Sequence, residues 1–274
     1  MEKNIDKLNA EFWNELCGNA LARHLGISDH SIESLQKFDK YYLDYYPYLL
    51  QEVPLKEFAG KKVLEIGLGY GTLGQQIVEA GACYTGLDVA KGPVRMMLHR
   101  LALQNLHGTV LRGSILDSPF GREEFDAVVS IGCYHHTGDV RRCVDETYRI
   151  LKRGGKAYIM LYNQFSFRQW RNWPKQTLLC LFTTWGIMKK KNSVINDEMR
   201  RSYDADSHEV AAPETSFHSI HELGTMFSRY SSARFSKQNC DHLILFHRLT
   251  IQREYLLSSL GKYLGLDIYV TATK

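Results

Sequence analysis

The stretch KVLEIGLGYGTLG, residues Lys62 to Gly74, decides the fold. It places four glycines behind a short apolar run that contains one acid, Glu65. A glycine-rich turn that leaves a strand lets the backbone approach a ligand closely, and the helix that follows presents free amides. Such turns serve several nucleotide-like cofactors, so the stretch predicts a cofactor site of that general kind.

The spacing of the glycines narrows the choice of cofactor. The last three formally satisfy GxGxxG, the dinucleotide fingerprint, so a nicotinamide or flavin enzyme is one reading. However, the apolar strand Val63 to Ile66 ends at Gly67, and counting from Gly67 meets Thr72 where the third glycine is required. What remains is an ExGxGxG pattern from Glu65 to Gly71, which argues against a dinucleotide cofactor.

Length and composition indicate a globular protein. With 274 residues and 44% hydrophobic content, the chain can bury a full core, as one large domain with additions. The start, MEKNIDKLNAEFWNEL, has no apolar signal region, and the longest apolar stretch, Thr177 to Met188, is too short to span a bilayer. Six cysteines are scattered without CxxC pairs, which favours reduced thiols. We therefore expect a cytoplasmic location.

Strand and helix patterns alternate along the middle of the chain. Helical pattern up to about Val53 predicts an N-terminal helical cap over residues 1–57. Short apolar runs then alternate with helical ones over residues 58–163, which predicts an α/β fold with a doubly wound parallel sheet. Residues 164–215 break this rhythm and are predicted to be an insertion after the fifth strand. A helix, an amphipathic stretch and a final strand complete the chain over residues 216–274.

With these elements in this order, the chain resembles the class I S-adenosylmethionine-dependent methyltransferases. The resemblance extends from Gly60 to Asn163 and includes the closing strand. VLEIGLGYG matches the first motif of that family, ExGxGxG, in full. The resemblance implies a Rossmann-like seven-stranded sheet, S-adenosyl-L-methionine as the cofactor, and a second acid, Asp88 in TGLDV, that takes the ribose hydroxyls. The cofactor contacts that it implies are Glu65, Gly67, Gly69, Tyr70, Gly71, Asp88, Val89, Ser114, Ile115 and Gly132.

Two further segments carry the resemblance. VLRGSILDSPF is similar to the third-strand segment of the family, with Ser114 in place of the usual acid, so backbone groups near Ser114 and Ile115 are expected to hold the adenine, and Asp117 is an open contact. FDAVVSIGCYHHTGDVRRCVDETYRILKRGG follows the fourth strand, the LHHxxD-like turn, the next helix and the LKPGG turn, with Arg153 in place of the proline.

Methyl transfer is an in-line displacement, and a base near the cofactor helps when the acceptor carries a proton. His135 and His136 lie in the fourth-strand turn and are the candidate catalytic residues, since histidine titrates near neutral pH. The alternative is that one of them is structural. Cys133 and Tyr134 are predicted to line the site.

Aromatic and histidine clusters are less specific. Five tyrosines in the cap suit either an aromatic or cationic cage or the packing of the cap against the core, and we expect packing: Tyr41, Tyr42, Tyr45, Tyr46 and Tyr48. His208, His218 and His221 lack carboxylate or thiol neighbours at ligand spacing, so no metal site is predicted.

The insertion has an unusual composition. Arg168 to Arg201 holds eight Lys and Arg against two acids, a net charge of +6 in a chain whose total is +4. NQFSFRQWRNWPK mixes these basic residues with tryptophans, which suits nucleotides, phosphosugars or a membrane face, or else a lid with snorkelling basic side chains. We expect a lid over the substrate, with peripheral membrane contact through residues 168–191 as the alternative.

The function predicted from these observations is a bacterial methyltransferase that acts on an oxygen or nitrogen of a small-molecule metabolite. Three alternatives stay open: an RNA methyltransferase, an enzyme for a lipid-linked or membrane-associated acceptor, and a cofactor-binding regulator without catalysis. RNA binding would use the basic insertion, and neutralising Lys189, Lys190 and Lys191 would then lower RNA affinity. We expect no specific RNA binding, because no recognised RNA-binding module is present.

Overall fold

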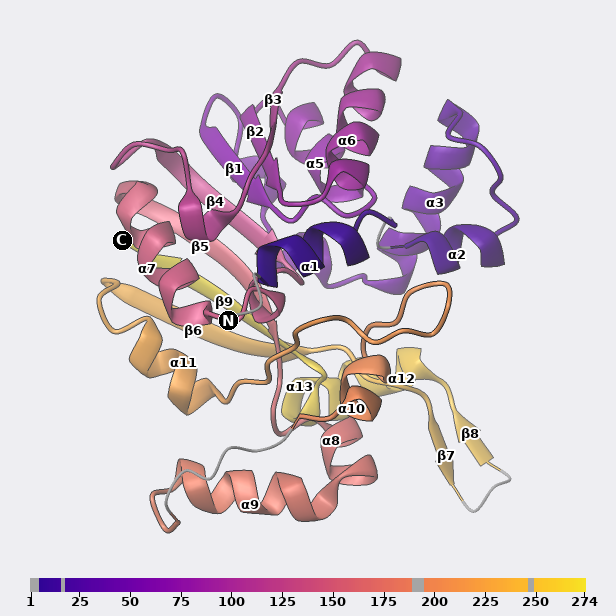
Figure 1. The fold of residues 1–274 in the computed structure, drawn as a ribbon, viewed down its shortest axis with the longest axis vertical. Coiled ribbons are helices and arrows are strands. Elements are labelled where there is room, and N and C mark those ends of the chain that lie inside the picture. The colour runs from indigo at the N-terminus through magenta and orange to yellow at the C-terminus, as the bar shows by residue number, and fades with distance from the viewer. Residues whose placement is uncertain (1–4, 16–17, 189–194, 246–248) are drawn as a thin grey trace.

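A computed structural model describes residues 5–15, 18–188, 195–245 and 249–274 (Figure 1). Its main sheet has seven strands in the order β3-β2-β1-β4-β5-β9-β6. Neighbours from β3 to β5 run parallel, whereas β9 pairs antiparallel with both β5 and β6. The predicted doubly wound, seven-stranded sheet is confirmed. The strands are β1 (Lys62–Ile66), β2 (Cys83–Asp88), β3 (Thr109–Arg112), β4 (Phe125–Ile131), β5 (Leu151–Tyr162), β6 (Ser232–Gln238) and β9 (Asp267–Thr273).

Helices cover both faces of this sheet. Side chains alternate between the two faces along a strand, so Val63 packs into the core on one face and Leu64 into the core on the other. Helices α5 (Thr72–Glu79) and α6 (Lys91–Leu103) pack with Val63. Helices α7 (Val140–Ile150) and α11 (Ile220–Met226) pack with Leu64.

The strand order places a crevice at the end of β1. Chain connections leave β1 toward β2 on one side, and β4 pairs with its other side, so the order reverses there. In open α/β sheets ligands bind outside the carboxyl ends of the strands at such a switch point. The glycine turn follows β1 and Gly132 follows β4, so both motifs meet at this crevice.

The N-terminal part is helical, as predicted, and covers the crevice. Its helices are α1 (Ile5–Phe12), α2 (Asn19–His24), α3 (Ile32–Tyr45) and α4 (Leu49–Glu52), followed by a short 3₁₀ turn, Leu55–Glu57. Helix α3 begins after Ser31, whose hydroxyl accepts a hydrogen bond from the backbone N–H of Ser34. In Figure 1 this cap lies beside α5 and α6.

The chain after β5 departs furthest from the sheet. Helices α8 (Phe167–Asn172), α9 (Pro174–Thr184) and α10 (Asp197–Arg201) follow β5 directly, at the place of the predicted insertion. Helix α9 lies at the edge of the molecule, at the bottom of Figure 1. Later come a small hairpin, β7 (Leu243–Leu245) and β8 (Leu249–Ile251), and two short helices, α12 (Arg253–Leu257) and α13 (Leu260–Leu264).

One local expectation needs adjustment. LKRGG does not precede the fifth strand but belongs to it, as an irregularity in which the partner of Phe125 is Leu151 and the partner of Ala127 is already Lys156. Five cysteines are free thiols in the part of the chain that the structure describes, and Cys17 lies outside it. Within the same described residues, no helix is both long and apolar enough to cross a membrane.

Candidate active site

A cavity of about 660 Å³ lies where the carboxyl ends of β1, β2 and β4 meet the cap. This volume is within the range of small-molecule and cofactor sites. Every predicted cofactor contact lines it, and the structure thus brings together residues from four separate loops: Glu65, Gly67, Gly69, Tyr70, Gly71, Asp88, Val89, Ser114, Ile115 and Gly132.

The glycine turn has a backbone that side chains would disturb. Gly67 has φ 83° and Gly71 has φ 80°, both in the left-handed region. A Cβ atom on Gly67 would also lie 2.6 Å from Cβ of Cys133, which follows β4. Helix α5 begins at Thr72, and Gly71 and Thr72 both line the cavity, so the helix N-terminus faces the ligand space.

Asp88 is held rigidly at the end of β2. Its Oδ2 accepts a hydrogen bond from the backbone N–H of Leu68, and its Oδ1 accepts one from Ala90, both at 2.8 Å. Burial raises the pKa of Asp88 to about 6. A carboxylate fixed in this way still has lone pairs for two neighbouring hydroxyl donors.

Glu65 is fully buried beside the turn. Burial raises the pKa of its carboxyl to about 8, and the Tyr84 hydroxyl donates to its Oε2 at 2.5 Å. The carboxyl therefore carries its proton at neutral pH. A Cβ atom on Gly74 would overlap this same Oε2 and lie 2.6 Å from the Tyr84 hydroxyl, which accounts for the fourth glycine of the motif.

The third-strand loop offers mostly backbone groups to the cavity. The Ser114 hydroxyl accepts from the backbone N–H of Leu116 at 3.1 Å and starts a 3₁₀ turn, Ile115–Asp117. Ser114 and Ile115 line the cavity, whereas Asp117 is absent from the described lining. The position of Asp117 does not support its role as a cofactor contact.

The two candidate histidines have different surroundings. Both lie in a 3₁₀ turn, Tyr134–His136, after β4. His135 is fully buried, stacks on Tyr162 with ring centroids 3.9 Å apart, and is absent from the described cavity lining. Neither of its ring nitrogens has a hydrogen-bond partner among the described residues, and burial lowers its pKa well below the usual value. His136 lines the cavity.

His136 faces an aspartate that the sequence analysis did not find. Its Nδ1 is 2.6 Å from the carbonyl oxygen of Glu214, which can only accept, so Nδ1 carries a hydrogen. Its Nε2 is 3.5 Å from Oδ2 of Asp204. Neutral imidazole and ionised carboxylate would place two acceptors against each other there, so the pair readily holds one proton. Burial raises the pKa of Asp204, which favours this arrangement.

Asp204 is positioned by Tyr162, whose hydroxyl donates to the two carboxylate oxygens at 3.0 and 3.1 Å. The side chain of Asp204 is 15% exposed and lines the cavity. It comes from an irregular segment after α10, where no strand, helix or motif marks it in the sequence.

His135, His136 and Asp204 also form a group of metal-ligand type, with ligand atoms within 4.8 Å of one another. It is the one group of this kind among the described residues, and no metal was expected from the sequence. Two of the three members already have hydrogen-bond partners, since His136 bonds to the Glu214 carbonyl and Asp204 accepts from the Tyr162 hydroxyl. His208 lines a different cavity, and Nδ1 of His218 lies 3.2 Å from Oε2 of Glu222.

The other half of the cavity is aromatic and acidic. It contains no Lys or Arg among the described lining residues. Burial raises the pKa of Asp267 to about 7, and the Asn239 amide donates to its carboxylate at 3.0 Å. The side chains that the cap, the insertion and the last strands contribute include Trp13, Tyr41, Tyr42, Tyr45, Tyr46, Tyr162, Tyr203, Asp204, Asn239, Asp267 and Tyr269.

The cap tyrosines therefore do more than the expected packing. Four of the five line the cavity, and Tyr48 alone among them is buried in the core without being part of the described lining. Tyr42, Tyr46 and Tyr48 also pack against the core, as expected, whereas Tyr41 and Tyr45 are exposed.

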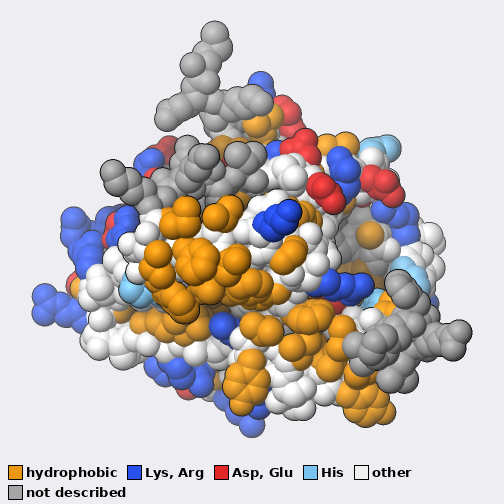
Figure 2. Space-filling view, turned by 90° about the horizontal axis from the view of Figure 1, so that it is seen from below, with side chains coloured by type: hydrophobic (Ala, Val, Ile, Leu, Met, Phe, Trp, Pro, Cys, Tyr) orange, Lys and Arg blue, Asp and Glu red, His pale blue; other side chains and the backbone are white. Residues whose placement is uncertain are grey.

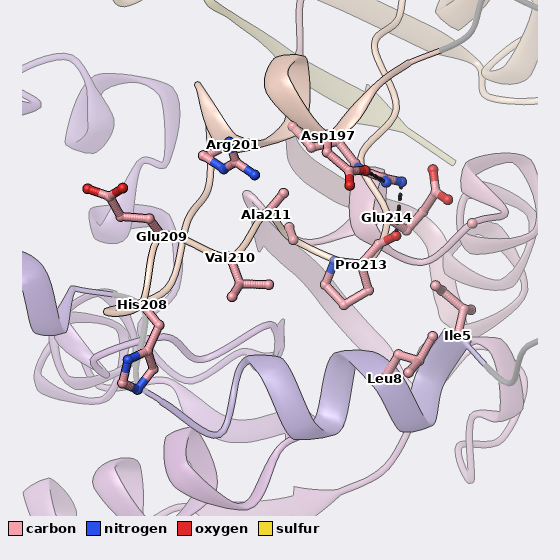
Figure 3. A pocket seen from close by; sticks show the side chains of 13 residues that line it. Ile5, Leu8, Asp197, Arg201, His208, Glu209, Val210, Ala211, Pro213 and Glu214 are labelled. Atoms are coloured by element: carbon pink, nitrogen blue, oxygen red, sulfur yellow. Dashed lines mark hydrogen bonds and ion pairs between the residues drawn. The ribbon is translucent and has the colours of Figure 1, made fainter.

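A second cavity, of about 780 Å³, lies between α1 and residues 208–214 (Figure 3). None of the predicted cofactor contacts lines it. Arg200 lines it, pairs with Asp197 and donates to the carbonyl oxygen of Pro213. The cavity at the glycine turn is thus the candidate active site.

The insertion reaches the cavity in part, and its role as a lid stays a prediction. Tyr203 and Asp204 reach the cavity, but no described residue of α8 or α9 lines it. Lys189, Lys190 and Lys191, which were expected to serve RNA binding if RNA were the acceptor, lie outside the described residues.

Comparison with known proteins agrees with this geometry. Residues 64–159 match the family model described as a methyltransferase domain. This chain carries a class I S-adenosylmethionine-dependent methyltransferase domain. The cofactor of such a domain is S-adenosyl-L-methionine.

Relatives of this methyltransferase domain are named as demethylmenaquinone and ubiquinone biosynthesis methyltransferases. The chain is 28% identical over 102 residues to a demethylmenaquinone methyltransferase of Tropheryma whipplei, covering 37% of this chain and 41% of the relative. It is 29% identical over 134 residues to a ubiquinone biosynthesis O-methyltransferase of Pseudomonas entomophila, covering 48% of this chain and 53% of the relative. The chain thus spans about half the length of the relatives it matches.

Two solved structures are similar to this chain in fold. An S-adenosylmethionine-dependent methyltransferase from Mesorhizobium loti has a TM-score of 0.56 and 15% identity, covering 85% of this chain and 100% of that one. Magnesium protoporphyrin IX methyltransferase from Synechocystis, solved with bound SAH, has a TM-score of 0.54 and 12% identity, covering 98% of this chain and 99% of that one.

Proposed function

We propose that this chain is an enzyme that transfers the methyl group of S-adenosyl-L-methionine to a hydroxyl oxygen of a small aromatic metabolite. The observation that carries the proposal is the His136 and Asp204 pair, which can take up a proton at the wall of a cavity lined by aromatic side chains. Methylation of a nitrogen on an acceptor of the same shape is the second candidate, because the cavity also carries buried acids that suit an amine.

The cofactor residues act as follows in this proposal. Gly67 to Gly71 would hold the methionine part of the cofactor, Asp88 would accept hydrogen bonds from the ribose hydroxyls, and backbone groups near Ser114 and Ile115 would hold the adenine. Bound in this way, the cofactor supplies an electrophilic methyl group on a sulfonium. The protein's part is to align the acceptor with that methyl group, to exclude water and to receive a proton.

His136 is the base in this proposal, and His135 is structural. A hydroxyl acceptor must lose its proton as it takes the methyl group, and a base must lie within hydrogen-bond reach of that proton. His136 lines the cavity, whereas His135 does not. The proton passes to an unprotonated Nε2 of His136, where the carboxylate of Asp204 stabilises it, while the Glu214 carbonyl accepts from the protonated Nδ1.

The lining favours an aromatic acceptor without phosphates. Aromatic rings pack well against tyrosine and tryptophan faces. A polyanion such as RNA or a phosphosugar would meet buried carboxylates and no Lys or Arg among the described lining residues. The relatives named for ubiquinone and demethylmenaquinone support the same chemical class. A regulator without catalysis would have no need of the proton-holding pair.

Transfer of a radiolabelled methyl group from S-adenosylmethionine to a panel of acceptors tests this function. The panel contains hydroxylated benzenes and naphthalenes, aromatic amines, and total bacterial RNA. We expect labelled methyl ethers from the hydroxylated aromatic compounds, and no label in RNA. Label in RNA alone would contradict the proposal, and label in the amines alone would replace the oxygen acceptor by a nitrogen.

A further inference from the structure

Helix α9 leaves an apolar surface open to solvent. Trp185 is 66% exposed and Ile187 is 65% exposed, and the other exposed large hydrophobic residues of this segment are Leu178, Leu179 and Met188. Figure 2 shows hydrophobic side chains gathered on the face seen from below Figure 1, where α9 lies, with Lys and Arg around its edges. We call Leu178, Leu179, Trp185, Ile187 and Met188 the α9 surface.

The helix is fixed to the body by its first turn. Trp173 and Thr177 are buried, and the Thr177 hydroxyl donates to the backbone carbonyls of Gln169 and Trp173. Leu178 and Trp185 lie seven residues apart, on one side of the helix. This side has no protein partner among the described residues. A contiguous apolar surface of this kind marks an interaction site.

The chain segment that carries the α9 surface has charges of one sign. Residues 164–196 contain no Asp or Glu. Arg171 and Lys175 are exposed beside the start of α9, whereas Arg168 is neutralised by Asp241 at 2.6 Å. Basic side chains at the rim of an apolar, tryptophan-containing helix face are complementary to an anionic lipid surface.

We propose that the α9 surface binds the face of an anionic lipid bilayer, with α9 lying in the plane of the interface. A symmetric contact with a second copy is the other way to cover such a surface. Residues 164–196 of the second copy contain no acid to pair with the exposed Arg171 and Lys175, so such a contact would leave these charges uncompensated. An anionic bilayer can contact the apolar side chains with its acyl region and pair with the basic side chains through its headgroups.

The position of the α9 surface connects it to the active site. Ser166, which caps α8, lies 3.0 Å from the hydroxyl of Tyr203, and the Arg168 guanidinium stacks on the ring of Tyr203 at 4.5 Å. Tyr203 lines the cavity. Docking through α9 therefore places one wall of the cavity close to the bilayer. The membrane contact itself stands on the α9 surface and does not depend on the proposed reaction.

Vesicle flotation with the full chain tests the contact without any measurement of activity. One vesicle set is phosphatidylcholine, and the other contains phosphatidylcholine and phosphatidylglycerol in equal amounts. We expect binding to the anionic set that weakens as salt is added, and a blue shift of fluorescence that is lost in Trp185→Phe. Combined Leu178→Ser, Leu179→Ser and Trp185→Ser should reduce vesicle binding by about tenfold or more.

Two controls keep the result specific. Leu98→Ser changes an equally exposed leucine on α6, at the opposite end of Figure 1, and should leave binding unchanged. Thermal unfolding shows whether the triple variant is folded. Wild-type protein that floats with neither vesicle set overturns the proposal. So does a wild-type dimer, seen by light scattering, that the triple substitution converts to a monomer without any vesicle binding.

Discussion

Asp39 and Arg100 form a buried, two-pronged ion pair that joins the cap to the glycine turn. Both carboxylate oxygens of Asp39 accept from the Arg100 guanidinium at 2.8 Å, and Arg100 is fully buried. The Nε of Arg100 also donates to the backbone carbonyl of Tyr70 at 2.7 Å. One side chain on α6 thus holds α3 and the cofactor loop together.

Asp39→Ala should lower the free energy of unfolding by about 3 to 5 kcal/mol, because it leaves a buried guanidinium without its counter-ion. It should also weaken cofactor binding, since the turn at Tyr70 loses its support. Asp44→Ala is the matched control, because Asp44 pairs with Lys40 on the exposed side of the same helix and should cost less than about 1 kcal/mol. Urea unfolding followed by circular dichroism measures both, and equal losses would contradict the role of the pair.

Asp88→Ala should weaken binding of S-adenosylhomocysteine about ten- to a hundredfold, because the ribose hydroxyls lose a charged acceptor. Isothermal calorimetry gives the dissociation constants. Asp117→Ala is the control, since Asp117 lies on the neighbouring loop but is not in the described lining. Unchanged affinity in Asp88→Ala would show that the ribose is held elsewhere.

The same carboxylate predicts how cofactor affinity depends on pH. Burial raises the pKa of Asp88 to about 6. A protonated carboxyl is a poorer acceptor than a carboxylate, so wild-type affinity should fall as the pH is lowered through 6. Calorimetry of the wild type and of Asp88→Ala over a pH series checks this, and the variant should show a flatter profile.

Glu65 predicts a pH dependence of stability. The pKa of this carboxyl rises from 4.5 to about 8 on burial, so between these pH values the folded protein binds one proton that the unfolded chain has lost. Its contribution to stability is therefore complete below pH 4.5 and is lost as the pH rises to about 8. Glu65→Gln removes this titration. Urea unfolding over the pH series should give a flatter curve for the variant, and parallel curves would refute the assignment.

The cofactor half of the site could be predicted from the sequence because its chemistry lies in contiguous motifs. Each contact sits at the end of an apolar strand, where the strand signal also fixes its position. Gly67 and Asp88, for example, follow β1 and end β2, and the parallel pairing of these strands brings them together. The edge strand β6 was missed, because it pairs with β9 alone and its half-buried residues form no apolar run.

Asp204 and the ion pair of Arg100 could not be predicted in the same way. Asp204 comes from an irregular segment, and its position beside His136 depends on how the folded chain returns to the cavity. Arg100 lies in a helix of mixed polarity, where an arginine indicates a solvated face. Its partner, Asp39, is 61 residues away, and no local pattern links the two. Long-range partners of this kind depend on the fold.

Removal of metal ions separates the two readings of His135, His136 and Asp204. If the group holds a proton, dialysis against a chelator should leave the turnover number unchanged, and elemental analysis should find no stoichiometric metal in the purified enzyme. Adding zinc should then restore nothing. A chelated protein that loses activity and regains it with one divalent ion would establish a metal centre in place of the proton pair.

Substitution of the proton pair is the most direct test of the chemistry. His136→Asn removes the group that receives the acceptor's proton, so kcat should fall by about 10² to 10⁴ while affinity for S-adenosylhomocysteine is retained. Asp204→Asn keeps the shape but cannot share the proton, so it should also lower kcat. In the wild type, kcat should rise with pH as the Asp204 carboxyl, whose pKa is raised by burial, becomes ionised, and this limb should be displaced or absent in Asp204→Asn. His135→Asn changes the neighbouring residue in the same turn and should affect stability more than kcat. Equal retention of kcat in His136→Asn and His135→Asn, for an acceptor with an ionisable hydroxyl, would show that solvent takes the proton and that the pair serves only to hold the insertion against the cavity.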